Sequence, residues 1–204
     1  MTASILLAHP YPKSFNHAIF NTVQKTCEKN GVHVYAHDLY EEQFNPVLTR
    51  QELGSDRSND PLVNQYAKEL VESDILVFIH QNWWGQPPAI LKGYIDRVIR
   101  PPHAYDFPDN DSGGGLPIEK LKGKLGVVYN TSNTDEEREN TYFCDPLDKI
   151  WGKCVFEFLG INRYHRRMFR IIADSSENER KAWLQEVEDE MTDIYQCIIK
   201  GSEA

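Results

Sequence analysis

The chain has few cysteines, and no two of them are spaced as a metal or redox motif requires. Cys27, Cys144, Cys154 and Cys197 are scattered and form no Cys-x-x-Cys pair. This spacing fits neither a zinc site nor a disulfide scaffold, and it is typical of proteins kept in a reducing compartment. We therefore expect a cytoplasmic location.

Long hydrophobic runs and an excess of basic charge are also missing. No segment approaches the roughly twenty apolar residues that a membrane-spanning helix needs, and the apolar stretch Ile5–Ala8 is too short for a signal-peptide core. The 22 Lys and Arg residues against 31 Asp and Glu residues give a net charge of −9. An acidic surface repels phosphate-rich partners. We therefore expect no nucleic-acid partner and no stable membrane insertion.

Several common motifs of catalysis and nucleotide binding do not occur. The sequence has no Gly-x-Gly-x-x-Gly after a strand, no Gly-Lys-Ser/Thr, no His-Glu-x-x-His and no Gly-x-Ser-x-Gly. This excludes the Rossmann fingerprint, the P-loop, zincin metalloproteases and the common α/β-hydrolase elbow. His33 and His37 lie four residues apart but in a strand pattern, so we expect no shared metal and no metal site.

What the chain does contain is an alternation of short apolar runs with amphipathic segments. Strands are predicted at residues 4–8, 32–39, 74–79, 125–129 and 167–173, and helices at 14–29, 61–73, 88–99, 146–159 and 176–200. Such an alternation argues for a parallel sheet covered on both faces. The predicted fold class is α/β, a flavodoxin-like three-layer sandwich with a five-stranded parallel sheet in the order 2-1-3-4-5. Together with the family resemblance described below, this alternation predicts that residues 1–204 form a single flavodoxin-like, flavin-binding domain.

The turn after the first predicted strand is suited to holding a phosphate. It runs from His9 to Asn16 and opens the first helix, where backbone N–H groups and the helix dipole attract anions. Ser14 and Asn16 can add hydrogen bonds to phosphate oxygens. The same residues also occur in ordinary capped turns, because Ser and Asn are common helix caps. The turn alone leaves both interpretations open.

Two more loops follow predicted strands and would meet the first at the same edge of the sheet. Gln81-Asn82-Trp83-Trp84-Gly85 carries two adjacent tryptophans, which suit a large flat ligand but could also close the core. Asn130-Thr131-Ser132-Asn133 offers small polar groups, and alone it would be a plain polar turn. Three loops converging on one edge predict a ligand site.

Longer stretches of the chain closely resemble the NAD(P)H:quinone dehydrogenase (DT-diaphorase-like) family, which has the flavodoxin-like fold. These stretches are His9 with Ser14-Phe15-Asn16, Asp38-Leu39-Tyr40, Phe44-Asn45-Pro46-Val47, and the segment from Trp83 to Val98. The resemblance is close through Tyr105 and loose to about Ile161.

The resemblance implies an enzyme with a flavin cofactor that transfers hydride from NAD(P)H through flavin N5 to a quinone or a similar small electrophile. It also implies a homodimer. The segment 44–47 is like that of FAD-binding members, so FAD is favoured. The connection before the third strand is short, which leaves FMN possible.

Roles can be carried over residue by residue as implications of the resemblance. His9, Ser14, Phe15 and Asn16 would hold the flavin phosphate or pyrophosphate. Asn82, Trp83, Trp84 and Gly85 would form the loop whose backbone amides face the flavin ring, with Gln81 beside them in cofactor binding. Asn130, Thr131, Ser132 and Asn133 would form the second ring-binding loop. Trp84 and Tyr105 would line the substrate pocket, Tyr105 from the partner subunit. The family's catalytic Tyr and His have no clear match, and Tyr142 is a candidate only by a loose alignment.

Two features depart from the family pattern. His80-Gln81 stands where the family often has Pro-Leu, and Asn130–Asn133 stands where Thr-Thr-Gly-Gly is usual. These departures keep a second hypothesis open, a flavin-binding regulatory or electron-transfer module with little turnover. A third is an α/β protein without flavin, its tryptophans being part of the core.

Overall fold

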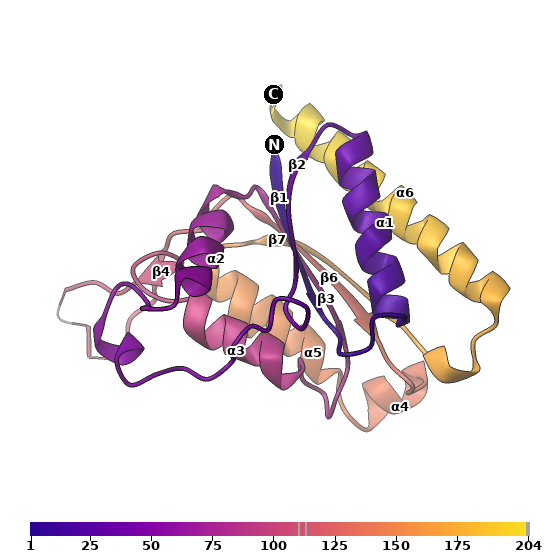
Figure 1. Cartoon of the computed structure of the whole chain (residues 1–204), viewed down its shortest axis with the longest axis horizontal. Helices are drawn as coiled ribbons and strands as arrows, with labels where there is room; N and C mark the ends of the chain where they lie inside the picture. Colours follow the sequence, from indigo (N-terminus) through magenta and orange to yellow (C-terminus); the bar gives the residue numbers. More distant parts are fainter. Residues whose placement is uncertain (110, 113, 203–204) are drawn as a thin grey trace.

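Five parallel strands form the central sheet, in the order β2-β1-β3-β6-β7 (Figure 1). The structure is a computed structural model that describes residues 1–109, 111–112 and 114–202, with side chains as far as Ile198. The strands are β1 (Thr2–Ala8), β2 (His33–Asp38), β3 (Ile75–Gln81), β6 (Leu125–Thr131) and β7 (Arg163–Phe169). Counted within this sheet the order is 2-1-3-4-5, which confirms the predicted topology.

Helices cover both faces of the sheet and make it the middle of three layers. Figure 1 shows α1 (Phe15–Lys29) and α6 (Glu177–Ser202) on one face, and α2 (Pro61–Glu72), α3 (Ala89–Val98) and α5 (Pro146–Asp148) on the other. The predicted helix at 146–159 is built from α5, a π-helix η2 (Lys149–Phe156) and a 3₁₀ turn η3 (Glu157–Leu159). In the described residues, no helix has both the length and the apolarity needed to cross a membrane.

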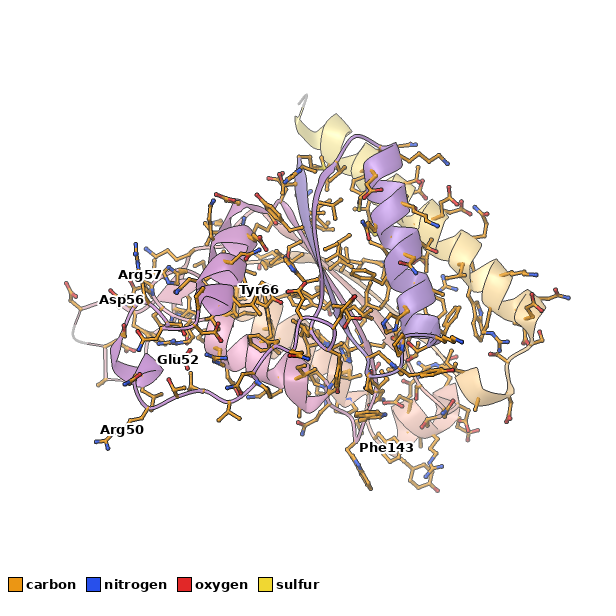
Figure 2. All side chains as sticks on the ribbon, viewed as in Figure 1. Arg50, Glu52, Asp56, Arg57, Tyr66 and Phe143 are labelled. Atoms are coloured by element: carbon orange, nitrogen blue, oxygen red, sulfur yellow. The ribbon has the colours of Figure 1, made fainter. Side chains whose placement is uncertain are left out.

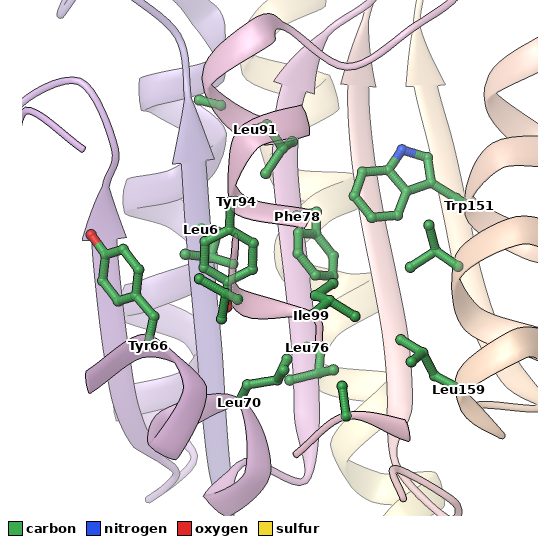
Figure 3. Close-up of a cluster of buried hydrophobic side chains, with 14 of the residues drawn as sticks. Leu6, Tyr66, Leu70, Leu76, Phe78, Leu91, Tyr94, Ile99, Trp151 and Leu159 are labelled. Carbon is green, nitrogen blue, oxygen red and sulfur yellow. The ribbon is translucent and has the colours of Figure 1, made fainter. Parts of the chain in front are cut away.

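The two faces of the sheet bury separate hydrophobic cores. All seven residues of β3 are buried, as expected for a continuous apolar run in the middle of a parallel sheet. On the α2–α3 face, aromatic rings extend across the strands from Tyr66 through Tyr94 and Phe78 to Trp151 (Figure 3). The Phe78 and Trp151 ring centroids are 4.5 Å apart. Rings of this size contribute much of the buried apolar area that fixes the helices on the sheet.

The fifth strand begins earlier than predicted. It spans Arg163–Phe169 rather than 167–173, so the predicted bounds of this strand were wrong. The charged residues of this strand have partners outside it: Arg166 pairs with Asp145 at 2.7 Å, and Arg167 pairs with Glu186 and Glu190 of α6. The strand ends because Ile171 has a left-handed backbone (φ 53°), which extended structure does not allow.

Short elements in the connections were not predicted. The loop after α3 contains a small antiparallel sheet of β4 (Tyr105–Asp106) and β5 (Ile118–Glu119). A 3₁₀ turn, η1 (Glu52–Gly54), lies in the connection before α2, and another, η4 (Ile172–Asp174), follows β7. Helix α4 (Glu136–Thr141) lies at the carboxyl edge of the sheet, beside the loops that follow β3 and β6 (Figure 1).

Candidate functional site

A cavity of about 960 Å³ opens at the carboxyl edge of the sheet, where β1, β3 and β6 end. Its size suits a cofactor or a drug-sized ligand, and its place is where open α/β sheets bind ligands. Phe143, one of its residues, lies at this end of the molecule, away from Glu52 and Asp56 (Figure 2). The structure therefore brings together the three loops that the sequence singled out. The lining residues are His9, Tyr11, Ser14, Phe15, Asn16, Gln81, Asn82, Trp83, Trp84, Gly85, Thr131, Ser132, Asn133, Thr134, Glu139, Tyr142, Phe143, Pro146 and Ile172.

The first loop places the N-terminus of α1 against the cavity. Ser14 is the N-cap, and its Oγ accepts a hydrogen bond from the His17 backbone N–H at 3.3 Å. The His9 Nδ1 accepts a hydrogen bond from the Tyr11 N–H at 3.1 Å, so the proton of the neutral ring is on Nε2. Burial lowers the pKa of His9, and the neighbouring His17 lowers it further. A helix N-terminus beside an imidazole N–H is a suitable environment for an anion.

The second loop is a tight turn held by Asn82. Its Oδ1 accepts a hydrogen bond from the Gly85 N–H at 2.9 Å, while Trp83 and Gln86 exchange two backbone hydrogen bonds. Trp84 (φ 58°) and Gly85 (φ 69°) have left-handed backbones. Trp84 is 100% exposed and Trp83 is 48% exposed, so the interpretation of these tryptophans as core residues is wrong.

The backbone amides of this turn are used differently from what the family resemblance implied. The Asn82 N–H donates to the Thr131 carbonyl at 2.7 Å, the Trp83 N–H to Gln86, and the Gly85 N–H to Asn82. Three of the four amides expected to face a ligand therefore donate within the protein. The turn contributes to the site through its shape and its aromatic side chains.

Two residues that line the cavity have buried polar atoms without partners. Asn16 and Gln81 both line it and are at least 95% buried. Asn16 Nδ2 donates to Thr131 Oγ1 at 2.7 Å, but its Oδ1 has no hydrogen-bond partner in the described part of the chain, and the same holds for both polar atoms of the Gln81 amide. Each such atom costs free energy unless a ligand or water pairs with it. Amides that can donate and accept fit the hydroxyl groups and ring amide groups of a flavin nucleotide.

Two of the residues assigned to the site, Asn130 and Tyr105, do not line the cavity. Asn130 is fully buried and points away from the cavity, where its amide bonds to His80 at 2.9 Å and to Arg166 at 2.9 Å. Its assignment to cofactor binding is therefore corrected to a supporting role behind the site. Tyr105 belongs to β4 and contacts Phe158, with ring centroids 5.0 Å apart, at a separate small cavity. Within one chain it does not line the site.

The sequence did not reveal the contribution of α4. Glu139, in α4, and Phe143, just after it, line the cavity. Tyr142 lines it too, and it is the residue that the loose alignment had offered as a candidate. Four more lining residues were missed by the sequence analysis: Tyr11, Thr134, Pro146 and Ile172. A signal for α4 was present: the Asp135 side chain accepts from the Arg138 N–H at 2.8 Å as an N-cap, and acidic residues follow it. An Asp cap followed by acidic residues in the first turn is a helix start signal.

The fold and the site together define a flavodoxin-like α/β protein with a ligand cavity at the carboxyl edge of its sheet. Residues 1–192 match the family Flavodoxin_2, described by its flavodoxin-like fold, and the chain belongs to this family.

The chain is also similar to proteins whose names state an activity. It is 30% identical over 194 residues to an uncharacterized NAD(P)H oxidoreductase of Haemophilus influenzae, with 91% of each chain covered. It is 30% identical over 209 residues to ribosyldihydronicotinamide dehydrogenase [quinone] of Mus musculus, covering 88% of this chain and 86% of the relative. The crystal structure of Smu.1420 from Streptococcus mutans superposes with a TM-score of 0.81 at 30% identity, covering 94% of this chain and 98% of that one. The chain is thus an enzyme of the flavodoxin-like NAD(P)H oxidoreductases.

Proposed function

We propose that this protein is a flavin-dependent NAD(P)H:acceptor oxidoreductase whose acceptor is a quinone or a similar small electrophile. The observation that carries the proposal is the pair of buried amides, Asn16 and Gln81, which line a large cavity beside the N-terminus of α1 and have polar atoms without partners in the described residues. The quinone acceptor is supported by the name of the mouse relative.

The cavity residues fall into groups that match the parts of a flavin nucleotide. The N-terminus of α1, with His9 and Ser14, suits the phosphate, and the amides of Asn16 and Gln81 suit polar groups of the ribityl chain or ring. Trp83 and Trp84 offer flat apolar surfaces at the mouth. A bound flavin supplies hydride acceptance and donation, while the protein positions the reactants and sets the local electrostatics. Tyr142 stays the candidate for a catalytic side chain, because it lines the cavity.

The segment 44–47 does not distinguish FAD from FMN through direct contact, because none of its residues lines the cavity. Instead it supports α3: the Arg97 guanidinium lies 5.5 Å from the centre of the Phe44 ring, and Arg97 Nη1 donates to the Asn45 carbonyl at 2.5 Å. FAD is our proposal, with FMN as the alternative. Extraction of the bound flavin and its identification by mass tests both, and purified protein without any flavin would contradict the proposal.

We further propose that the active form is a homodimer in which Tyr105 completes the partner's substrate pocket beside Trp84. Trp84 and Tyr142 at the cavity mouth are 100% and 81% exposed, an unusual exposure for large aromatic side chains that a second subunit would reduce. Sedimentation with activity assays tests this. A monomer with full activity would contradict the shared pocket.

The rate of NAD(P)H oxidation distinguishes a quinone reductase from a flavin-binding module with little turnover. NADH and NADPH oxidation should be followed with a benzoquinone as the acceptor, using flavin-loaded protein. Rapid oxidation that depends on the benzoquinone is expected. Flavin-loaded protein that does not reduce the benzoquinone would contradict the proposed acceptor class.

A further inference from the structure

Glu139 is a buried acidic residue whose role neither the fold nor the family resemblance explains. It belongs to α4, is fully buried and lines the cavity. Its Oε1 accepts a hydrogen bond from Asn82 Nδ2 at 3.0 Å. Its Oε2 is also buried and has no hydrogen-bond partner within the described residues. One carboxyl oxygen is therefore held in place, and the other is left without a protein partner beside the cavity.

The bond to Asn82 orients the Glu139 side chain. Asn82 Oδ1 is occupied by the Gly85 N–H at 2.9 Å, so the Asn82 amide must direct its Nδ2 toward Glu139. If the amide were flipped, two oxygens would face each other at the Glu139 carboxylate. Glu139 thus joins α4 to the Trp83–Gly85 turn and cannot easily move away from the cavity.

The cavity wall offers little to offset a negative charge on Glu139. In the set of described residues that line the cavity, Glu139 is the only carboxylate, and no Lys or Arg is present. Burial lowers the pKa of His9, which favours the neutral form of its ring. Charges in a partly enclosed site of reduced dielectric act over longer distances than they do in water.

Building on the proposed function, we propose that Glu139, in the wall of the cavity, lies beside the bound flavin and makes it a stronger reductant. Reduction of a flavin adds electrons and negative charge to it. A carboxylate in the same cavity repels that charge, so it weakens the binding of the reduced flavin more than that of the oxidised flavin. The midpoint potential of the bound flavin is lowered, which favours delivery of hydride to the acceptor.

The test is the midpoint potential of the bound flavin, measured by spectroscopic redox titration. Glu139→Gln removes the charge and keeps an oxygen that can accept the Asn82 hydrogen bond. We expect the reduced flavin to bind about tenfold more tightly, relative to the oxidised flavin, than in the wild type. For a two-electron couple this is an increase of about 30 mV.

Two further variants separate the local charge from other effects. Glu136→Gln removes the same charge from an exposed position of α4, and the potential should not change, because solvent screens that position. Glu139→Asp keeps the charge, and its potential should stay close to that of the wild type. Glu139→Leu removes both the charge and the Asn82 bond, so it provides a second charge-free measurement if Glu139→Gln does not fold.

The outcomes distinguish this inference from the proposed function. An unchanged potential in a folded, flavin-loaded Glu139→Gln or Glu139→Leu protein would overturn the role of Glu139 and leave the proposed function standing. An equal rise in Glu136→Gln would also overturn it, because the effect would then be one of net charge. Wild-type protein that takes up neither FMN nor FAD would overturn both proposals.

Discussion

The indole N–H of Trp151 donates a hydrogen bond to Nε2 of His80 across 3.0 Å, and both side chains are fully buried. The Asn130 amide N–H approaches the same imidazole nitrogen at 2.9 Å. Because both neighbours can only donate through these atoms, Nε2 of His80 carries no proton, and Nδ1 donates to the Gln81 carbonyl at 2.8 Å. Arg166 fixes the Asn130 amide in turn, through a 2.9 Å bond to its Oδ1. A neutral imidazole thus anchors the end of β3 directly behind the cavity.

The first prediction concerns the stability of the fold in acid. Burial lowers the pKa of His80 from 6.5 to about 4. Between these values the unfolded state binds a proton that the folded state does not, so the free energy of unfolding falls as the pH falls. The expected loss is about 1.4 kcal/mol per pH unit, or roughly 3 kcal/mol in all. In His80→Gln this contribution should vanish.

Urea unfolding of the wild type and of His80→Gln from pH 7 to pH 4 measures the difference. The two free energies should converge as the pH falls. His33→Gln is the control, because His33 is exposed and its replacement should leave the pH dependence as in the wild type. A difference between wild type and His80→Gln that is constant with pH would contradict the buried neutral imidazole.

The second prediction concerns the buried ion pair that holds the connection before α2. Arg97 Nη2 and Glu52 Oε1 are 2.8 Å apart, and both side chains are almost completely buried. Arg97→Met should destabilise the protein by about 3–5 kcal/mol, because it leaves the Glu52 carboxylate buried without its partner. The double variant with Glu52→Gln should lose clearly less than the sum of the two single changes.

Arg50 provides the matched control for this pair. It is exposed at the periphery of the same connection (Figure 2), and Arg50→Met should change stability by no more than about 0.5 kcal/mol. Urea denaturation measures all four variants. Additive losses in the double variant would show that the two side chains do not depend on each other.

The third prediction concerns Gly93, where α3 touches the connection after β2. A Cβ at Gly93 would lie 2.3 Å from Cβ and the carbonyl oxygen of Pro46. Gly93→Ala should therefore displace residues 45–46 and destabilise the fold by about 1–3 kcal/mol. At Gly54 a Cβ would meet nothing within 4 Å, so Gly54→Ala should be close to neutral. Thermal unfolding compares the two, and equal melting temperatures would contradict the close packing.

The fourth prediction concerns the shape of the Trp83–Gly85 turn. Gly85 has φ 69°, and a Cβ there would lie 2.5 Å from Cγ of Pro146. Gly85→Ala should weaken flavin binding at least tenfold, because both strain and the clash reshape the cavity. Gly31→Ala has the same kind of backbone (φ 71°) but open space around it, and it lies outside the cavity. It should lose stability by about 1 kcal/mol and keep its flavin affinity.

Trp83→Phe completes this comparison. The two backbone hydrogen bonds of Trp83 with Gln86 do not depend on the side chain, so the turn should keep its shape and the protein should keep its flavin. Fluorescence titration of the apoproteins with FMN and with FAD measures all three variants. Flavin loss in Trp83→Phe equal to that in Gly85→Ala would contradict this, because the indole ring would then hold the cofactor as much as the shape of the turn does.

Much of the fold was predictable because its signals are local. The run Ile75–Ile79 has no polar residue, which only a strand buried on both faces accommodates, and it became the central strand β3. Strand β7 was harder to predict, since its arginines look like surface residues until Asp145, Glu186 and Glu190 are placed beside them. These carboxylates are between 19 and 23 residues away in sequence from their partners. Local periodicity contains no information about such pairs.

The candidate site was also predictable only in part. The sequence by itself determined that His9–Asn16, Gln81–Gly85 and the loop after β6 would meet, because the carboxyl ends of parallel strands share one edge of a sheet. Only the tertiary structure decided which side chains face the cavity. Strand β6 extends to Thr131, and successive residues of a strand point to opposite faces, so Thr131 faces the cavity while Asn130 points back to His80. Glu139 reaches the same cavity only because α4 packs beside Asn82, a contact between residues 57 positions apart in the chain.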